Sequence, residues 1–321
     1  MSPTLPLVLL LAILAGCGFT QRIAENDEVD PGRLPSAARA VTVAELGPCN
    51  ESKDRTLHLD PRQPVNVLVH GCNGSTGNFR ALAEVLAFHG QQSACFTYDD
   101  RDSLRVSAGR LATAVVMIAR YLETPEVTVI GHSMGGLVAR MALTDASRDW
   151  GLNRQINLKL VTVSAPFAGI AAARFCAFPL LRIASLGLND IACWLISGDN
   201  WYEITGASDF IRQPGPLAPQ VRGHLSVVTD ERQSCRRRDG SSRCLVDDYV
   251  FSLAEQRHPM VTDLPGTTNV EIRAGHVEIV GEPGVTPHKL IVVLQGEGIV
   301  RPTPPERQSA FEDLLAQLYR R

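Results

Sequence analysis

The sequence predicts an α/β fold in which a mostly parallel central sheet is covered by helices on both faces. Short β-branched runs such as "VNVLV" (65–69) and "EVTVI" (126–130) alternate with longer segments whose apolar residues recur at helical spacing. The 321 residues, 45% of them hydrophobic and 20% charged, have the composition of an ordinary folded protein with one large core. In such folds the functional residues gather at the carboxyl ends of the strands.

Charge and composition exclude several classes of partner. The formal net charge of −3 argues against nucleic acid, because binding to phosphates requires a basic surface. The sequence contains neither an internal repeat nor Cys and His residues at the spacing of metal ligands. We therefore expect no metal and no organic cofactor.

The N-terminal segment "LPLVLLLAILAGC" (5–17) has the length of the apolar region of a signal peptide and is short for a membrane span. Its end resembles a bacterial lipobox, although no Lys or Arg precedes it. The resemblance implies removal of residues 1–16 and acylation of Cys17, with palmitate among the chains. It also implies an outer-membrane lipoprotein facing the periplasm, since Gly18 is not acidic. The alternative is a buried core helix.

The rest of the chain divides into a tether and one large domain. Residues 17–40 are polar and contain Pro and Gly, which is typical of a flexible tether, and residues 41–321 form the predicted domain. Export permits disulfides, and an odd number of cysteines follows Cys17. We expect the pairs Cys235–Cys244, Cys176–Cys193 and Cys49–Cys95, with Cys72 left as a thiol.

A serine stands between small residues where a strand meets a helix. Residues 104–122 carry a helical apolar stripe, Pro125 ends it, and "EVTVI" follows as a buried strand. The next residues, "GHSMG" (131–135), match the nucleophile elbow, in which a strained turn exposes the serine, here Ser133. Residues two before and two after this serine must be small, because they pack against neighbouring backbone.

A second glycine-rich turn lies one strand–helix unit earlier. The stretch "PVNVLVHGCNGSTGNFRAL" (64–82) reads as a strand, a turn and a helix that starts near Asn78. Its His70-Gly71 pair resembles the oxyanion loop of lipases and related α/β-hydrolases. The resemblance implies that the backbone N–H groups of Cys72 and Met134 hold the oxyanion. The alternative is that His70 and Cys72 only shape the turn.

A long insertion follows the strand that ends at Ser164. The residues after this strand are similar to the Thr-Pro-His-x-Gly stretch of lipases, with Phe167 in place of the histidine. Residues 167–222 contain too many apolar residues for a free loop, so we expect helices that form a cap or lid. The alternative is an extension of the core by the large apolar side chains of this segment: Phe175, Phe178, Leu180, Leu181 and Trp194.

The acid of a Ser–acid–His triad should follow the serine in the chain. Asp248 lies in a stretch that resembles the Asp-Gly-Val-Val segment carrying the acid in lipases, with Tyr249 in place of the glycine. We therefore expect Asp248 to be the acid. The alternatives are Asp230, at the end of the predicted strand 224–229, and Asp247.

The base should come last. His276 follows a short strand and a glycine, as in the Gly-His segment of lipases, and is the predicted base. His288, before an apolar run, is the second choice, and His258 precedes a proline in an expected loop. His132, inside the elbow, is expected to be a packing residue.

Taken together, residues 65–280 resemble the α/β-hydrolases, and the branch of bacterial lipases and GPI-inositol-deacylase-like proteins in particular. The resemblance implies a serine hydrolase that cleaves carboxylic esters of acyl chains, a lipase, esterase or lysophospholipase, through Ser133, Asp248 and His276. The apolar insertion favours an acyl chain as substrate. One alternative is a thioesterase or amidase with the same triad. Another is a catalytically inactive lipoprotein that binds a lipid or an envelope partner.

Overall fold

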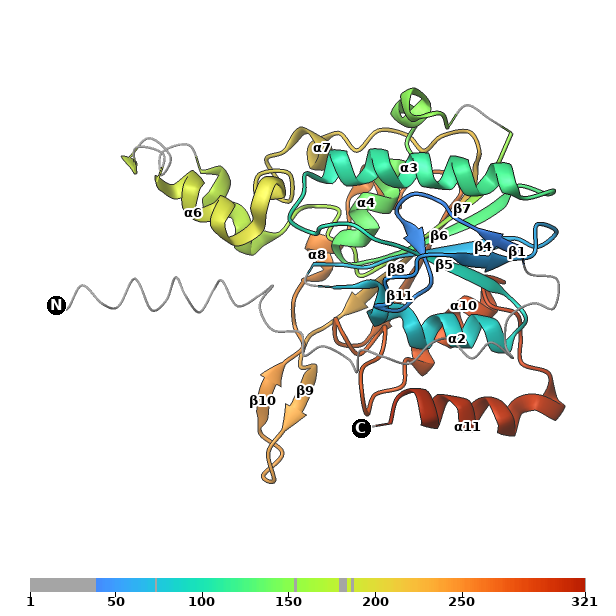
Figure 1. Ribbon diagram of the computed structural model, residues 1–321. Coiled ribbons are helices and arrows are strands. Elements are labelled where there is room, and N and C mark those ends of the chain that lie inside the picture. The colour runs from blue at the N-terminus through green and yellow to red at the C-terminus, as the bar shows by residue number, and fades with distance from the viewer. Residues whose placement is uncertain (1–38, 73, 153–154, 179–183, 186–187, 321) are drawn as a thin grey trace.

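The computed structural model describes residues 39–320, apart from residues 73, 153–154, 179–183 and 186–187. At its centre lies a seven-stranded sheet in which only the short edge strand β2 runs antiparallel to its neighbour (Figure 1). The strand order is β11 (Thr267–Arg273), β8 (Val221–Asp230), β7 (Asn157–Val163), β6 (Glu126–His132), β4 (Val65–Val69), β5 (Gln92–Phe96) and β2 (Leu46–Gly47). The predicted mostly parallel sheet is confirmed.

Helices cover both faces of this sheet, as predicted (Figure 1). Neighbouring residues of one strand, such as Val67 and Leu68 of β4, belong to the separate apolar cores on its two faces. Strands buried on both faces are rich in Val and other apolar residues, and β4 is buried at all five of its positions. One core contains α3 (Leu104–Tyr121) and α4 (Met134–Ala142), and the other contains α2 (Arg80–Phe88), α10 (His288–Gly296) and α11 (Gln308–Leu318).

Shorter elements complete the described chain. The first, β1 (Arg39–Val41), pairs with β3 (Leu57–Leu59), so residues 39 and 40 of the predicted tether belong to a strand. The other predictions for the N-terminus, a signal peptide over residues 1–16 and a lipid on Cys17, fall outside the described residues. Within the described part of the chain, no helix is both long enough and apolar enough to cross a membrane. Outside the segment between β7 and β8, the described residues also form the short helices α8 (Leu253–Gln256) and α9 (Pro259–Thr262), with 3-10 turns at Thr76–Phe79, Asp145–Trp150 and Pro305–Arg307.

The predicted cap folds as short helices between β7 and β8. They are a 3-10 helix (Ala171–Ala177), α6 (Leu188–Ser197), a 3-10 turn (Gly198–Asn200) and α7 (Asp209–Arg212). In Figure 1, α6 projects away from the sheet. Phe178 and Trp194 are about half exposed, so these two side chains do not extend the core.

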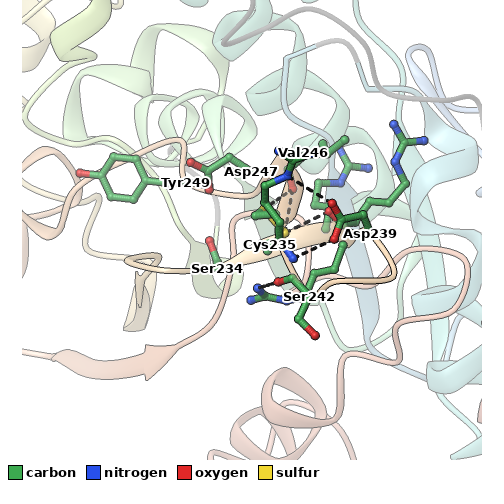
Figure 2. Close-up of a disulfide and its surroundings, with 12 residues drawn as sticks. Ser234, Cys235, Asp239, Ser242, Val246, Asp247 and Tyr249 are labelled. Atoms are coloured by element: carbon green, nitrogen blue, oxygen red, sulfur yellow. Dashed lines mark hydrogen bonds and ion pairs between the residues drawn. A yellow bond between two sulfur atoms is a disulfide. The ribbon is translucent and has the colours of Figure 1, made fainter.

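All three expected disulfides are present. Cys49–Cys95 joins β5 to the loop between β2 and β3, Cys176–Cys193 lies within the cap, and Cys235–Cys244 links the two strands of a hairpin. The hairpin consists of β9 (Cys235–Arg238) and β10 (Cys244–Asp247), and it projects from the carboxyl end of β8 (Figure 1). Figure 2 shows this disulfide and Asp239, whose carboxylate accepts hydrogen bonds from the backbone N–H groups of Ser241 and Arg243 in the turn. Cys72 stands outside these disulfides, as expected.

Candidate active site

Ser133 lies between the end of β6 and the start of α4. Its backbone has φ 56° and ψ −129°, a region that a residue with a side chain enters only when its surroundings force it. The surroundings are close-packed backbone, as the neighbouring glycines show. A Cβ on Gly135 would lie 2.2 Å from the carbonyl oxygen of His70. A Cβ on Gly131 would lie 2.4 Å from the carbonyl oxygen of Gly135. The predicted elbow is therefore present, and its small residues are required by close backbone packing.

His276 brings its imidazole to this serine from the turn after β11. Its Nε2 lies 3.0 Å from Ser133 Oγ, although 143 positions separate the two residues in the chain. Phe251 packs edge-on against the imidazole with a ring separation of 4.8 Å, and the His132 ring lies at the same distance on another side. The sequence prediction that His276 reaches Ser133 agrees with this geometry.

The carboxylate against the imidazole belongs to Glu231 and not to Asp248. Glu231 Oε1 lies 2.9 Å from His276 Nδ1, and the Glu231 side chain is fully buried. Its other oxygen, Oε2, accepts hydrogen bonds from the backbone N–H groups of Val250 and Phe251. These two donors hold the carboxylate at a fixed orientation, with Oε1 directed at the ring. The prediction of Asp248 as the residue that orients His276 is wrong.

The physical reason is the direction of the Asp248 side chain. Its carboxylate accepts hydrogen bonds from the backbone N–H groups of Val277 and Glu278, at 3.0 Å each. Asp248 therefore binds the backbone of the turn that carries His276. The position beside the imidazole that was predicted for Asp248 is occupied by Glu231. Both carboxylates are buried, but only that of Glu231 contacts the imidazole.

The two alternative aspartates lie away from the imidazole. Asp230, the last residue of β8, forms an ion pair with Arg232, and the hydrogen bonds from this guanidinium lower the pKa of Asp230 to about 2. Asp247 is exposed and accepts a hydrogen bond from the backbone N–H of Tyr249. The labelled side chains of Asp247 and Tyr249 lie beside the hairpin in Figure 2.

The other candidate histidines have structural contacts. His132 donates from Nε2 to the carbonyl oxygen of His276, and burial lowers its pKa to about 3, which keeps the ring neutral. His258 caps α9, where its Nδ1 accepts a hydrogen bond from the Met260 N–H. His288 begins α10 and is exposed. Thus His132 is a packing residue, as expected, and it supports the backbone of His276.

The loop that contains Gly71 passes directly over Ser133. A Cβ on Gly71 would lie 2.8 Å from Ser133 Cβ and 3.3 Å from Ser133 Oγ, so this position admits glycine alone. Tyr98 fixes the loop, since its hydroxyl donates to the carbonyl oxygen of His70 and its ring stacks on the His70 ring. Cys72 follows Gly71 in this loop and is half-buried.

Met134 stands on the other side of the serine, at the first position of α4. The first N–H groups of a helix have no partner within the helix and favour negative charge. The assignment of Cys72 and Met134 as oxyanion donors stays a prediction.

Two hydroxyl groups extend the hydrogen-bonded row beyond Glu231. Thr229 Oγ1 donates to Glu231 Oε1 at 2.9 Å, and Ser164 Oγ lies 2.8 Å from Thr229 Oγ1. Gln256 accepts from the Thr229 N–H and donates to the Thr229 carbonyl oxygen, which joins α8 to the end of β8. The Glu231 carboxylate thus receives four hydrogen bonds when the imidazole is included. Such saturation fixes a buried charge in one place.

Glu231 is the residue that sequence reasoning missed. It follows Asp230 directly at the carboxyl end of β8, and the triad order admits glutamate as well as aspartate. That strand end was the available signal, because the residue just beyond a parallel strand lies at the edge where Ser133 lies. The resemblance of the later Asp247-Asp248 stretch to a lipase segment favoured instead an acid at the end of the second strand of the hairpin, β10.

Among the residues that the structure describes, no group of three or more His, Cys, Asp or Glu side chains is placed to hold a metal ion. The chemistry available at this site is that of a hydroxyl, an imidazole and a carboxylate in a hydrogen-bonded row. Such a row activates the hydroxyl as a nucleophile, because the imidazole can accept its proton and the carboxylate stabilises the charged ring.

Comparison with known proteins identifies the fold. A family model described as the PGAP1-like alpha/beta domain matches residues 61–175, a range that contains Ser133. A search of the curated proteins found no match. The lipase BlEst2 of Bacillus licheniformis in its mature form superimposes with a TM-score of 0.51 at 18% identity, covering 75% of this chain and 94% of that one.

Two further structures are similar over large parts of the chain. The propeptide form of BlEst2 superimposes with a TM-score of 0.51 at 17% identity, covering 77% of this chain and 52% of that one. Esterase B from Lactobacillus rhamnosis covers 98% of this chain and 93% of its own, at 14% identity and a TM-score of 0.43. The chain therefore has the fold of the lipase BlEst2, and within it residues 61–175 match a PGAP1-like alpha/beta domain.

Proposed function

We propose that the protein is a serine hydrolase that cleaves carboxylic esters of acyl chains through Ser133, His276 and Glu231. One observation carries the proposal. The imidazole of His276 lies within hydrogen-bond distance of both the Ser133 hydroxyl, at 3.0 Å, and the Glu231 carboxylate, at 2.9 Å. A serine in a strained turn that contacts such a pair is the arrangement of an activated nucleophile.

The mechanism follows from these contacts. Ser133 Oγ attacks the ester carbonyl while His276 Nε2 accepts its proton, and Glu231 holds the Nδ1–H tautomer and stabilises the imidazolium. The backbone N–H groups of Cys72 and Met134 stabilise the oxyanion. The imidazolium then gives its proton to the leaving alkoxide, and water attacks the acyl-enzyme with His276 as the base.

The cap supports an acyl chain as the part of the substrate that is recognised. Asn200 of the cap contacts Met134 Sδ and donates to the carbonyl oxygen of Asp100, which places the cap against the residue after Ser133. The neighbouring helix α6 exposes a row of apolar side chains: Leu188, Ile191, Trp194 and Leu195. Exposed apolar side chains on the cap favour contact with an alkyl chain over a sugar or a peptide.

Reaction with a fluorophosphonate probe tests the nucleophile. We expect Ser133 to be labelled in the wild type, with labelling abolished in Ser133→Ala and strongly slowed in His276→Ala. An unlabelled wild type would overturn the proposal in favour of an inactive binding protein. Hydrolysis of nitrophenyl acyl esters of increasing length, compared with acyl-CoA and acyl anilides, tests the bond that is cleaved. Preference for acyl-CoA or for anilides would identify a thioesterase or an amidase.

We further propose that Cys17 is acylated and anchors the enzyme to the outer membrane, facing the periplasm. Two features support this location: the lipobox-like end of the apolar N-terminal segment and the three disulfides, which form in oxidising compartments. Metabolic labelling with a palmitate analogue in a bacterial host should mark the wild type and not Cys17→Ser. Cys72→Ser is the matched control, because it removes the other thiol and should leave the labelling unchanged.

A further inference from the structure

Asp248 is a buried carboxylate that the proposed mechanism does not use. It follows β10 directly, so the hairpin separates it from Glu231 in the chain. Its side chain is buried, as is that of Glu231, although charged side chains avoid the interior unless they are paired. The contacts that compensate this burial indicate what the residue does.

Each of these contacts is made to the turn that carries the base. Asp248 Oδ1 lies 3.0 Å from the Val277 nitrogen and Oδ2 lies 3.0 Å from the Glu278 nitrogen. The Asp248 carbonyl oxygen accepts the N–H of His276 itself, also at 3.0 Å. One residue therefore accepts the N–H groups of three successive residues, beginning with the base.

The fit between Asp248 and this turn is close. A Cβ on Gly275 would lie 2.0 Å from Asp248 Oδ2, so only glycine lets the carboxylate approach the turn. The turn has further supports, since Glu278 accepts the Gly275 N–H and binds Lys289 of α10, and His132 donates to the carbonyl oxygen of His276. The position of the imidazole depends on the position of the backbone that carries it. The hydrogen bonds that hold this turn therefore also position the imidazole.

We propose that Asp248 is a positioning residue, whose carboxylate holds the turn 275–278 so that the imidazole of His276 lies between Glu231 and Ser133. This inference rests on the proposed function of the triad. The two buried acids then divide the task, because Glu231 orients the ring and Asp248 orients the backbone below it.

The charges around Asp248 make this hold dependent on pH. Burial raises the pKa of Asp248 to about 6, while its backbone hydrogen bonds, the imidazole of His276 and the guanidinium of Arg236 act in the opposite direction. Arg236 of β9 is itself paired with Glu282, and Glu278 lies on the turn. A protonated carboxyl group accepts backbone N–H groups less strongly than a carboxylate does, so the turn should be held less firmly below this pH.

The test is the kinetics of Asp248→Asn in the full chain, with Asp247→Asn as the matched control. We expect kcat for a nitrophenyl acyl ester to fall about 10²-fold with KM unchanged, because a small displacement of a catalytic group has effects of this size. The rate of fluorophosphonate labelling at Ser133 should fall by the same factor. Thermal melting establishes that the variant is folded.

The pH profile separates positioning from a general structural role. The imidazole alone gives log(kcat/KM) a limiting slope of about one on the acidic side. We expect a steeper limb in the wild type, where Asp248 also titrates, and a slope of about one in Asp248→Asn. Wild-type kcat in the variant, a loss carried by KM, or equal slopes in the two proteins would overturn the inference. A wild type that is neither active nor labelled would instead overturn the proposed function.

Discussion

Two short acidic segments border the hairpin β9–β10, and they use their buried carboxylates differently. Before the hairpin stand Asp230 and Glu231, and at its end stand Asp247, the last residue of β10, and Asp248. In each segment the first residue is at least partly exposed and bonded locally, and the second is buried in the site. Glu231 reaches the imidazole of His276, whereas Asp248 reaches only the backbone beside it.

The difference shows that charge and burial do not define a catalytic acid. Glu231 lies at the end of a central parallel strand and spans the distance to the ring with a side chain one methylene longer. Asp248 enters from the end of a projecting hairpin and meets the turn first. The two roles differ in the atom that each carboxylate contacts. Glu231 contacts the ring nitrogen of His276, and Asp248 contacts backbone nitrogens of the same turn.

The largest effect should come from neutralising the acid that contacts the ring. We expect Glu231→Gln to lower kcat about 10⁴-fold, because the imidazole loses the partner that fixes its tautomer and stabilises its charge. Glu231→Asp should be intermediate, since it keeps the charge and shortens the reach. The measurement is steady-state hydrolysis of a nitrophenyl acyl ester near neutral pH. Near-wild-type kcat in Glu231→Gln, with a 10⁴-fold loss in Asp248→Asn, would exchange the two roles.

A substitution opposite Asp248 should have a smaller effect on the same reaction. In Gly275→Ala the new Cβ would lie 2.0 Å from Asp248 Oδ2, so the turn has to shift. We expect kcat to fall about 10²-fold, as for a modest displacement of the base. Gly240→Ala at the hairpin tip is the control, because a Cβ there meets nothing within 4 Å. Full activity in Gly275→Ala would show that the turn tolerates displacement.

The buried charge of Asp248 should also appear in the pH dependence of stability. Its folded pKa of about 6 exceeds the ordinary 3.8, so between these values the folded state binds a proton that the unfolded state has released. Stability therefore falls as pH rises through this interval. We expect the Tm of the wild type to decline from pH 4 to pH 7 relative to that of Asp248→Asn. A pH-independent difference in Tm would contradict a raised pKa.

The smallest effects belong to the first aspartate of each segment. We expect Asp230→Asn and Asp247→Asn to keep kcat within about twofold of the wild type, as is typical of surface substitutions. The hydrogen bonds from Arg232 lower the pKa of Asp230 to about 2, so the stability from this contact is present above about pH 4 and lost below it. Parallel assays of the two variants check this expectation. A large loss in either would mean that the exposed residues share in the site.

The order of elements could be predicted from the sequence because it depends on local patterns. Burial on both faces makes β4 and β6 rich in Val, and small residues around Ser133 mark a turn that only such residues permit. The three expected disulfides are present, and Cys235–Cys244 is the pair with a local signal, the Asp239-Gly240 turn between its cysteines. The pairing of Ser133 with His276 followed from the order of residues in the resembling family, and the distance of 3.0 Å agrees with it.

The choice between the carboxylates of the two segments was decided by the tertiary structure. The four candidate acids lie no more than eighteen positions apart, and each carries a carboxyl group, so no local pattern distinguishes them: Asp230, Glu231, Asp247 and Asp248. The choice depends on where the end of β8 lies relative to the turn after β11, two parallel neighbours whose contact joins residues far apart in the chain. The sequence by itself determined that a carboxylate would meet the imidazole. Only the packing of β8 beside β11, with the hairpin folded outward, made that carboxylate Glu231.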